Sequence, residues 1–333
     1  MKAFALRRDE QHGDLVGRVL CQDIPGAFRK GHVLRAEDIP LLIGAAWSEI
    51  HLLELGADDV GQREAGQRLA QILSSDAVLI APAGHRHVMK AKHDGLLKID
   101  SAALRRLNGI AGIAVFTLMN DQVVSAEQVV AEAQITPLAI DRRSIDEVET
   151  IARERPVVRL LPFVPRDVMV WTRDDRVVHA LTEKLRRFGC HLRDVLDLPR
   201  DPSSIRESLE RQPAALFLVS GSNALDPLDP VFIALKQMGA TMQRVGMPLH
   251  PGTLLWIASW REVTIIGLPS CGLGPQLTAF DLVLPKLLAE GAIRDDDLAA
   301  LGHGGKLSAS FSPQRGEKVP EGRMRGSSLR GPS

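Results

Sequence analysis

The sequence contains no tyrosine and few aromatic residues of any kind. Aromatic side chains make up 4% of the 333 residues. Proteins that bind single-stranded nucleic acid stack the bases on such rings, so their scarcity argues against that role. The formal net charge is +0 at pH 7. A chain without excess positive charge lacks a general attraction for nucleic acid or anionic membranes. We therefore expect neither class of partner.

Cysteines and long apolar runs are also scarce. Only Cys21, Cys190 and Cys271 occur, and no two of them form a CxxC pair. Their odd number and wide spacing argue against a disulfide framework and against a zinc site, and are typical of a reducing cytosol. No apolar run reaches the roughly 18 residues of a membrane-spanning helix. The first residues lack the apolar segment of a signal peptide. We expect a cytoplasmic globular protein.

Composition, together with the glycine and proline residues that mark turns, divides the chain into four parts. Residues 1–80 are predicted to form a small N-terminal α/β unit, and residues 81–163 an irregular β-rich region. Residues 164–305 are predicted to form an α/β domain. From residue 306 to 333, glycine, proline and positive charge interrupt every pattern, which indicates a disordered tail.

Strands alternate with helices in the third part. Apolar runs predict strands at 168–172, 191–198, 216–219 and 263–266. Helical patterns lie between them, at 177–189, 203–212 and 230–238. This alternation implies right-handed crossovers and a parallel sheet, so the fold class is α/β.

Small residues follow several of these strands. Gly221, Ser222 and Asn223 come after one strand, Pro251 and Gly252 form a turn, and Pro269 and Ser270 follow another strand. The carboxyl ends of parallel strands meet at one edge, which is where open α/β sheets bind ligands. Small residues let backbone N–H groups approach an anion there. A bland alternative is that the Pro-Gly pair is only a turn.

Acidic residues accompany the same loops. Asp226 and Asp229 precede a helix, and Thr172 and Asp174 follow a strand. Such carboxylates can hold a metal ion or orient an oxyanion. They can equally cap the free N–H groups at a helix N-terminus, and the spacing does not decide between these interpretations. Cys271 is a reactive thiol if it lies at a helix N-terminus, and otherwise a packed small residue.

A separate histidine cluster lies in the second part. His85 and His87, two apart, would share one face of a strand and could hold a metal with His93. Because no carboxylate or cysteine has suitable spacing, we favour a loop whose side chains face solvent or phosphate. Arg86 suits phosphate, since a guanidinium binds it in bidentate fashion.

These motifs resemble a known family. Residues 166–304 are similar to the molybdopterin-binding domain of molybdopterin molybdotransferases and adenylyltransferases. The matching segments are Val170–Asp174, Val219–Ser222, Asp229, His250–Gly252 and Gly267–Ser270. In the N-terminal half, Gly17–Ile24 is similar to the N-terminal segment of the molybdotransferase. The chain to about residue 305 is most similar to a shorter branch, the molybdopterin-binding proteins.

The resemblance implies a three-layer domain with a parallel sheet that binds molybdopterin, with molybdate as a second substrate. It implies cofactor binding by Thr172, Asp174, Gly221, Ser222, Asn223, Pro251, Gly252, Pro269 and Ser270. Asp226 and Asp229 would be catalytic and would hold Mg2+. It further implies a homodimer in which the region 1–150 approaches the partner's site, with Arg86 and His87 as candidates to reach it.

The sequence departs from the family's motifs at three positions. Ser222 replaces a glycine, Thr253 replaces a lysine, and Cys271-Gly272 replaces an Asn-Pro pair. The transferase's C-terminal β-domain has no counterpart. Two hypotheses follow. The chain is a molybdotransferase that inserts molybdate, or a non-catalytic carrier or sensor that serves proteins maturing molybdenum enzymes. A third is a related protein acting on a nucleotide-like substrate.

Overall fold

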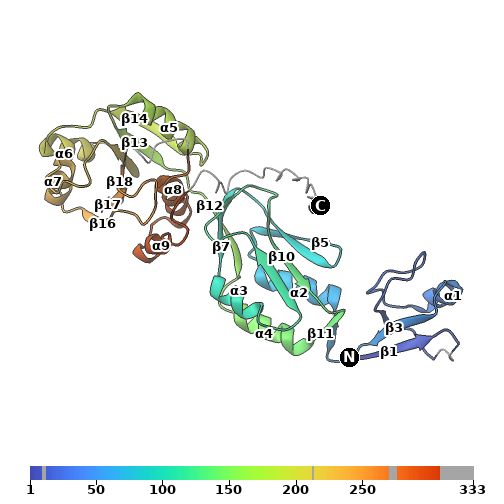
Figure 1. Ribbon diagram of the computed structural model, residues 1–333. Helices are drawn as coiled ribbons and strands as arrows, with labels where there is room; N and C mark the ends of the chain where they lie inside the picture. Colours follow the sequence, from blue (N-terminus) through green and yellow to red (C-terminus); the bar gives the residue numbers. More distant parts are fainter. Residues whose placement is uncertain (10–12, 212–213, 270–275, 308–333) are drawn as a thin grey trace, which may run out of the picture.

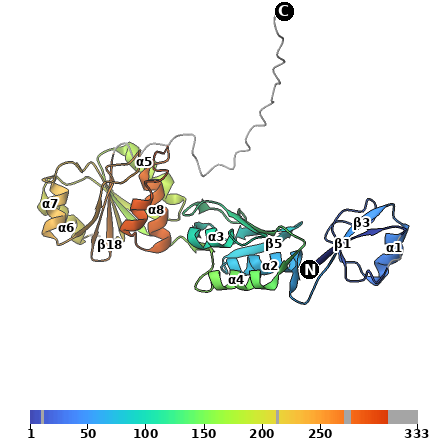
Figure 2. The same ribbon diagram turned by 60° about the horizontal axis from the view of Figure 1, so that its bottom comes forward.

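The chain folds into three units that follow one another in sequence and in space (Figures 1 and 2). The structure is a computed structural model, and it describes residues 1–9, 13–211, 214–269 and 276–307. Within those residues, no helix has the length and hydrophobicity to cross a membrane.

The N-terminal unit is a small antiparallel sheet with one short helix. Its elements are β1 (Lys2–Arg7), β2 (Val19–Leu20), the 3-10 helix η1 (Ala36–Asp38), α1 (Ile39–Gly44) and β3 (Glu49–Glu54). The strand order is β1-β3-β2. Alternate residues of β3, including Ile50 and Leu52, are buried against Leu20 and Leu42. This period of two is what a sheet with one covered face requires.

The middle unit is rich in strands. Its elements are β4 (Asp59–Gly61), α2 (Gln62–Leu73), β5 (Val78–Ala83), β6 (Arg86–Ala91), β7 (Gly95–Ile99), α3 (Ser101–Leu107), β8 (Ile113–Thr117), β9 (Val123–Val124), β10 (Val129–Ile135), β11 (Ala139–Asp141), α4 (Arg142–Ala152) and β12 (Val158–Pro162). The largest sheet has the order β5-β6-β10-β8. Helix α2 was grouped with the N-terminal unit in the sequence analysis. Its buried residues, such as Leu69, instead belong to the same core as Met89 and Ala133 of the middle unit.

The C-terminal unit is built on a six-stranded sheet. Its strands are β13 (Asp167–Trp171), β14 (His191–Leu196), β15 (Leu216–Ser220), β16 (Thr241–Val245), β17 (Trp256–Trp260) and β18 (Val263–Leu268), in the order β14-β13-β15-β18-β17-β16. The first four in this order are parallel. The prediction of a parallel sheet is wrong for β17, which is antiparallel to both neighbours. Residues 261–262 alone join β17 to β18, and so short a connection excludes a parallel crossover.

Helices pack on both faces of this sheet (Figure 2). Helices α5 (Asp175–Arg186) and α8 (Ala279–Glu290) share a core with Val168, Val170 and Leu218. Helices α6 (Pro202–Arg211) and α7 (Pro230–Gln237) share a second core with Met169 and Phe217, whose side chains point to the opposite face. Strands buried on both faces explain the continuous apolar runs. The short helix α9 (Asp295–Ala300) follows α8.

The end of the described chain differs from the prediction. The backbone N–H of His250 donates to the Gly305 carbonyl, and that of Leu307 donates to the His250 carbonyl, so Lys306 forms a bridge with His250. The predicted disordered tail therefore begins too early at residue 306. The rest of that prediction concerns residues 308–333, which lie outside the described residues.

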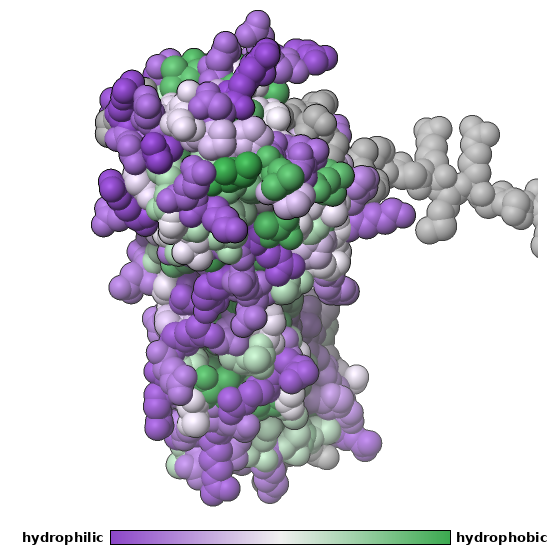
Figure 3. Space-filling model, turned by 90° about the vertical axis from the view of Figure 1, so that its left-hand side faces the viewer, coloured by the Kyte–Doolittle hydropathy of each residue, from purple (hydrophilic) through white to green (hydrophobic). Residues whose placement is uncertain are grey.

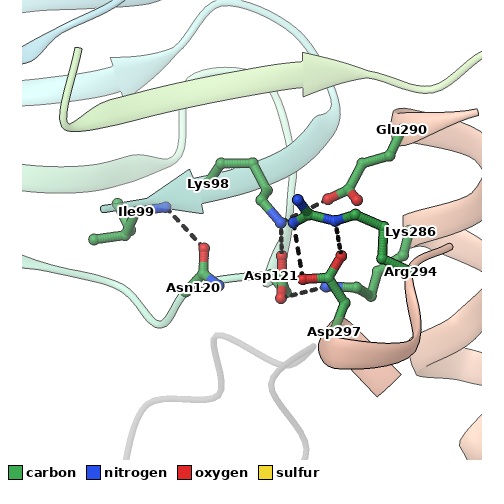
Figure 4. Close-up of polar contacts among 8 residues, drawn as sticks. All are labelled: Lys98, Ile99, Asn120, Asp121, Lys286, Glu290, Arg294 and Asp297. Atoms are coloured by element: carbon green, nitrogen blue, oxygen red, sulfur yellow. Dashed lines mark hydrogen bonds and ion pairs between the residues drawn. The ribbon is translucent and has the colours of Figure 1, made fainter. Parts of the chain in front are cut away.

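A cluster of charged side chains joins the middle and C-terminal units (Figure 4). Lys98 Nζ lies 2.5 Å from Asp121 Oδ1 and 2.6 Å from Glu290 Oε1. Burial disfavours the charge on Lys98, but the hydrogen bonds that Lys98 donates to Asp121 and Glu290 outweigh it and raise the pKa of Lys98. Lys286 of α8 completes the cluster from the other unit. Paired charges at this junction fix how the two units meet.

Candidate functional site

One row of paired residues crosses the C-terminal sheet at the ends of its strands. Trp171 pairs with Leu196 on one side and with Val219 on the other. Val219 pairs with Gly267, and Gly267 with Trp256. The row ends at Val245 of β16, which pairs with Trp256. The loops that follow β13 and β15, and the β16–β17 turn, leave the sheet just beyond this row, and β18 ends there with Pro269.

The structure therefore brings most of the candidate residues to one edge of the sheet. Those that it places there are Thr172, Asp174, Gly221, Ser222, Asn223, Asp226, Asp229, Pro251, Gly252 and Pro269. Pro269 directly follows β18 and is half-buried. Ser270 and Cys271 lie outside the described residues.

Thr172 and Asp174 form the turn from β13 into α5. The Thr172 hydroxyl, almost fully buried, accepts from the Asp174 backbone N–H at 3.1 Å. Asp174 caps α5 by accepting from the Arg176 backbone N–H. Its two oxygens also accept from Nε and Nη2 of the Arg176 guanidinium, which holds the pKa of Asp174 below its usual range. Asp174 is thus a helix cap, and its negative charge is already paired with Arg176.

Asp229 caps the next helix and closes the loop before it. Its Oδ1 accepts from the Val231 N–H at 2.9 Å, and its Oδ2 from the Asn223 N–H at 2.8 Å. Gly221 begins this loop with a φ of +105°, a backbone conformation that other residues rarely adopt. Both carboxylate oxygens of Asp229 are therefore occupied by backbone donors, although each keeps a second lone pair.

Asp226 lies within the same loop and is exposed. Its Oδ1 accepts from the Leu228 N–H at 2.9 Å, and its backbone carbonyl accepts from the Asp229 N–H. These are turn contacts of the kind that Asp makes before a helix. The other carboxylate oxygen, Oδ2, has no hydrogen-bond partner among the described residues.

The turn at Pro251 and Gly252 is packed against the start of α8. The Ala279 backbone N–H donates to the Pro251 carbonyl at 3.0 Å. Gly252 has a φ of +109°, and a Cβ there would lie 2.5 Å from the Ala279 Cβ. The Thr253 hydroxyl donates to the Leu249 carbonyl at 2.7 Å. Glycine is thus required by close packing, while Thr253 stabilises the turn itself.

Trp256 is a member of this edge that the sequence analysis missed. Its indole Nε1 donates to the Ser222 Oγ at 3.1 Å, which ties the first loop to β17. A Cβ on Gly267 would overlap the indole ring, so glycine at this position makes room for the ring. The apolar run that contains Trp256 is a signal for a strand, although no strand is predicted there. Trp171, at the end of β13, is also buried, and its Nε1 has no partner within the described chain.

The histidine cluster lies elsewhere, and His85 and His93 lie in the turns before and after β6, as the loop prediction expects. Arg86 and His87 belong to β6, and Arg86 Nη1 lies 2.7 Å from Glu132 Oε2. His87 is buried, and its ring faces Gly66 of α2. Among the described residues, no group of three or more His, Cys, Asp or Glu side chains could hold a metal. Arg86 is thus paired within its own chain and His87 is buried against α2, and their reach into a partner's cleft stays a prediction.

Comparisons with known proteins add only remote similarities. No protein-family model matches the chain, and no curated protein sequence matches it. Two solved structures of the molybdopterin biosynthesis protein moeA from Pyrococcus horikoshii are 12% identical, cover 71% and 70% of this chain and 75% and 80% of their own, and give TM-scores of 0.29 and 0.24. A molybdenum cofactor biosynthesis protein from Pyrococcus furiosus is 13% identical, covers 71% of this chain and 74% of its own, and gives a TM-score of 0.23. TM-scores this low do not establish a common fold.

Proposed function

We propose that this chain binds molybdopterin at the edge of the C-terminal sheet and acts in molybdenum cofactor biosynthesis, in a role like that of a molybdotransferase. The observation that carries the proposal is the row of paired residues from Leu196 to Val245. It puts the motif loops after β13 and β15 beside one another and beside the end of β18. The sequence motifs that resemble the family are therefore adjacent in space as well as ordered along the chain.

The chemistry of this edge suits an anionic ligand with polar substituents. Molybdopterin carries a phosphate and a dithiolene, so its site needs backbone donors and a few polar side chains. Gly221 allows close approach of a ligand to the backbone. The Ser222 hydroxyl, which accepts from Trp256, keeps its own O–H free to donate. Helices α5 and α7 begin at this edge, and their N-termini favour negative charge.

The donor set does not by itself fit a Mg2+ site. Mg2+ prefers near-octahedral oxygen ligands and often takes one or two carboxylates together with water and a substrate phosphate. Asp229 already accepts two backbone N–H groups, and Asp226 accepts one. The part proposed for Asp229 is to hold the loop 221–229 and to orient a protonated oxygen of molybdate beside the bound pterin.

A non-catalytic carrier is the second candidate, and a specific contact favours it. The family's lysine after the Pro-Gly turn would offset the charge of molybdate. Thr253 stands in its place, and its hydroxyl is used by the Leu249 carbonyl. The edge thus lacks one cation that insertion of an oxyanion would use. A carrier has no such need, because it holds the finished cofactor only.

The pterin content of the purified protein tests the shared part of both candidates. Protein made in a host that synthesises the cofactor should release a fluorescent pterin after oxidation, at close to one per chain. Ser222→Asp introduces a charge that repels the ligand's phosphate and should lower this content several-fold. Ser125→Asp, an exposed position of the middle unit, is the matched control. No pterin in the wild-type protein, or equal pterin in both variants, would refute the proposed site.

Molybdenum incorporation separates the two candidates. Asp229→Ala should abolish molybdate insertion by a transferase while pterin retention stays nearly intact, because a carboxylate is poorly suited to hold an anionic phosphate. In a carrier, the same change should affect neither measurement. Loss of pterin retention in a folded Asp229→Ala protein would contradict both candidates.

A further inference from the structure

A large cleft lies between the N-terminal and middle units, far along the chain from the sheet edge described above. Its volume is about 1250 Å³, which is ample for a small organic ligand. Polar and charged residues along it are Asp23, Arg29, Lys30, Asp59, Gln62, Arg63, Glu64, Gln67, His85, His87, Gln134 and Thr136. Leu55, Pro137 and Leu138 supply an apolar wall.

The N-terminus of α2 opens into this cleft. Gly61 is the N-cap, and with no side chain it leaves the first turn without a side-chain cap. The Gln62 N–H donates to the Leu138 carbonyl. The first-turn N–H groups of Arg63 and Glu64 have no carbonyl four residues earlier within the helix to bond. An uncapped helix N-terminus of this kind carries partial positive charge and favours an anion.

A buried histidine lines the same cleft and points independently to a ligand. His87 is 5% exposed, and its Nδ1 has no hydrogen-bond partner in the part of the chain that the structure describes. Its ring lies against Gly66 of α2, where a Cβ would be 2.9 Å from Nδ1. Burial and the nearby Arg63 charge lower the pKa of His87. Nδ1 itself has almost no exposed surface, so His87 faces the cleft through its other ring atoms.

The charges around the cleft leave a positive excess for such a ligand. Asp59 accepts from the Gly56 N–H and lies 2.5 Å from the amino group of Met1. Asp23 accepts from the Lys30 N–H and lies 3.7 Å from Arg29.

The cations in the cleft are less engaged than these acids. The side chains of Lys30 and Arg63 form no ion pair with the described residues and are exposed. Among the acidic residues of the cleft, only Glu64 has no ion pair with the described residues.

We propose that this cleft binds a phosphate monoester, with the phosphate at the N-terminus of α2 and within reach of His87, Arg63 and Lys30, and the organic part against Leu55, Pro137 and Leu138. A dianionic phosphate matches two unpaired cations, a helix N-terminus and a ring N–H better than a single carboxylate does. The lining contains no Phe or Trp among the described residues, so the site is not built to stack a nucleobase.

Titration calorimetry with phenyl phosphate tests this inference on the full-length protein. Phenyl phosphate should bind with one site per chain, and inorganic phosphate more weakly because it lacks the organic part. Phenol, which has no phosphate, should not bind. Arg63→Gln and Lys30→Gln should each weaken phenyl phosphate binding by about tenfold, the effect of losing one charge-assisted hydrogen bond. Arg105→Gln, which removes an exposed charge from α3, should leave the affinity unchanged.

The NMR resonances of the His87 ring give a second measurement. Attraction of phosphate to surface charge alone would not change them. In NMR spectra, saturating phenyl phosphate should shift the His87 ring resonances and raise the pH at which they titrate, and His87→Gln should abolish tight binding. Binding that is unaffected by Arg63→Gln and His87→Gln, or no binding at millimolar phenyl phosphate, would overturn the proposal. The pterin content of the sheet-edge site is measured separately, so either site can fail without the other.

Discussion

The Nζ atom of Lys286 lies 2.5 Å from Oδ2 of Asp121, and the two residues belong to different units of the chain. Lys286 is on α8, and its side chain is only 2% exposed. Asp121 also accepts from Lys98, so one carboxylate compensates two lysines (Figure 4). A buried ammonium is tolerated only when such a partner is present.

Removing that carboxylate should destabilise the protein strongly. Asp121 has a φ of +63°, which Asn also tolerates, so Asp121→Asn keeps the backbone while it removes the charge. We expect a loss of about 3 kcal/mol in the free energy of unfolding, because Lys286 stays buried without its counter-ion. Lys286→Met should cost much less, since Asp121 keeps Lys98. Urea unfolding measures both, with exposed Arg211→Gln as control. Similar values for Asp121→Asn and the control would contradict this account.

A side chain at Gly267 should disturb the sheet edge. In Gly267→Ala the new methyl group overlaps the Trp256 indole, which must move away from Ser222. We expect a loss of up to about 3 kcal/mol in stability, typical of overpacking, and a changed tryptophan fluorescence spectrum. Gly44→Ala has open space around the added carbon and should change stability by less than about 1 kcal/mol. An unaltered fluorescence spectrum for Gly267→Ala would argue against the Trp256–Ser222 contact.

The cap at Asp229 should be measurable apart from any activity. Asp229→Ala removes acceptors for Val231 and Asn223 and should lower the free energy of unfolding by about 1 to 2 kcal/mol. Asp229→Asn keeps one acceptor and should cost less. Asp226→Ala, at an exposed turn residue, should cost least of the three. Thermal unfolding gives this order, and a larger effect at Asp226 than at Asp229 would be inconsistent with the contacts.

Asp100 should make stability depend on acid pH. Its hydrogen bond from the Ala103 N–H, together with the Arg155 guanidinium, lowers the pKa of Asp100. A lowered folded-state pKa stabilises the protein above the unfolded pKa of about 3.9, and this contribution is lost as pH falls through the folded value. Asp100→Ala should therefore cost about 1 kcal/mol near pH 6, and the difference from wild type should shrink toward pH 3. A difference that stays constant over this range would contradict the assignment.

The chain should form a homodimer, as its resemblance to the molybdotransferases implies. Large apolar side chains are exposed on the C-terminal unit, including Leu225, Leu228 and Val245. Figure 3 shows apolar areas that interrupt the hydrophilic surface. Light scattering at micromolar concentration should give about twice the chain mass of 36.3 kDa. A mass equal to one chain would refute this prediction.

Local patterns in the sequence were sufficient for several elements of the C-terminal unit. The strand at 216–219 and the helix at 230–238 agree closely with β15 and α7. Continuous apolar runs and capping residues fix such elements through contacts between near neighbours. The same local rules did not reveal β16, β17 or α8. Pro285 lies inside α8, and tertiary packing overrides its unfavourable helix propensity.

The sequence by itself determined that small and acidic residues follow the strands, because turns and helix caps require them locally. Only the tertiary structure decided what these residues contact. Asp229 binds Asn223, Gly267 makes room for Trp256, and α2 joins the middle unit. The cleft with His87 was likewise hidden, since its residues come from two units and are widely separated along the chain. Such contacts depend on strand order and on how units pack, and the physics of neighbouring residues does not specify these over long separations.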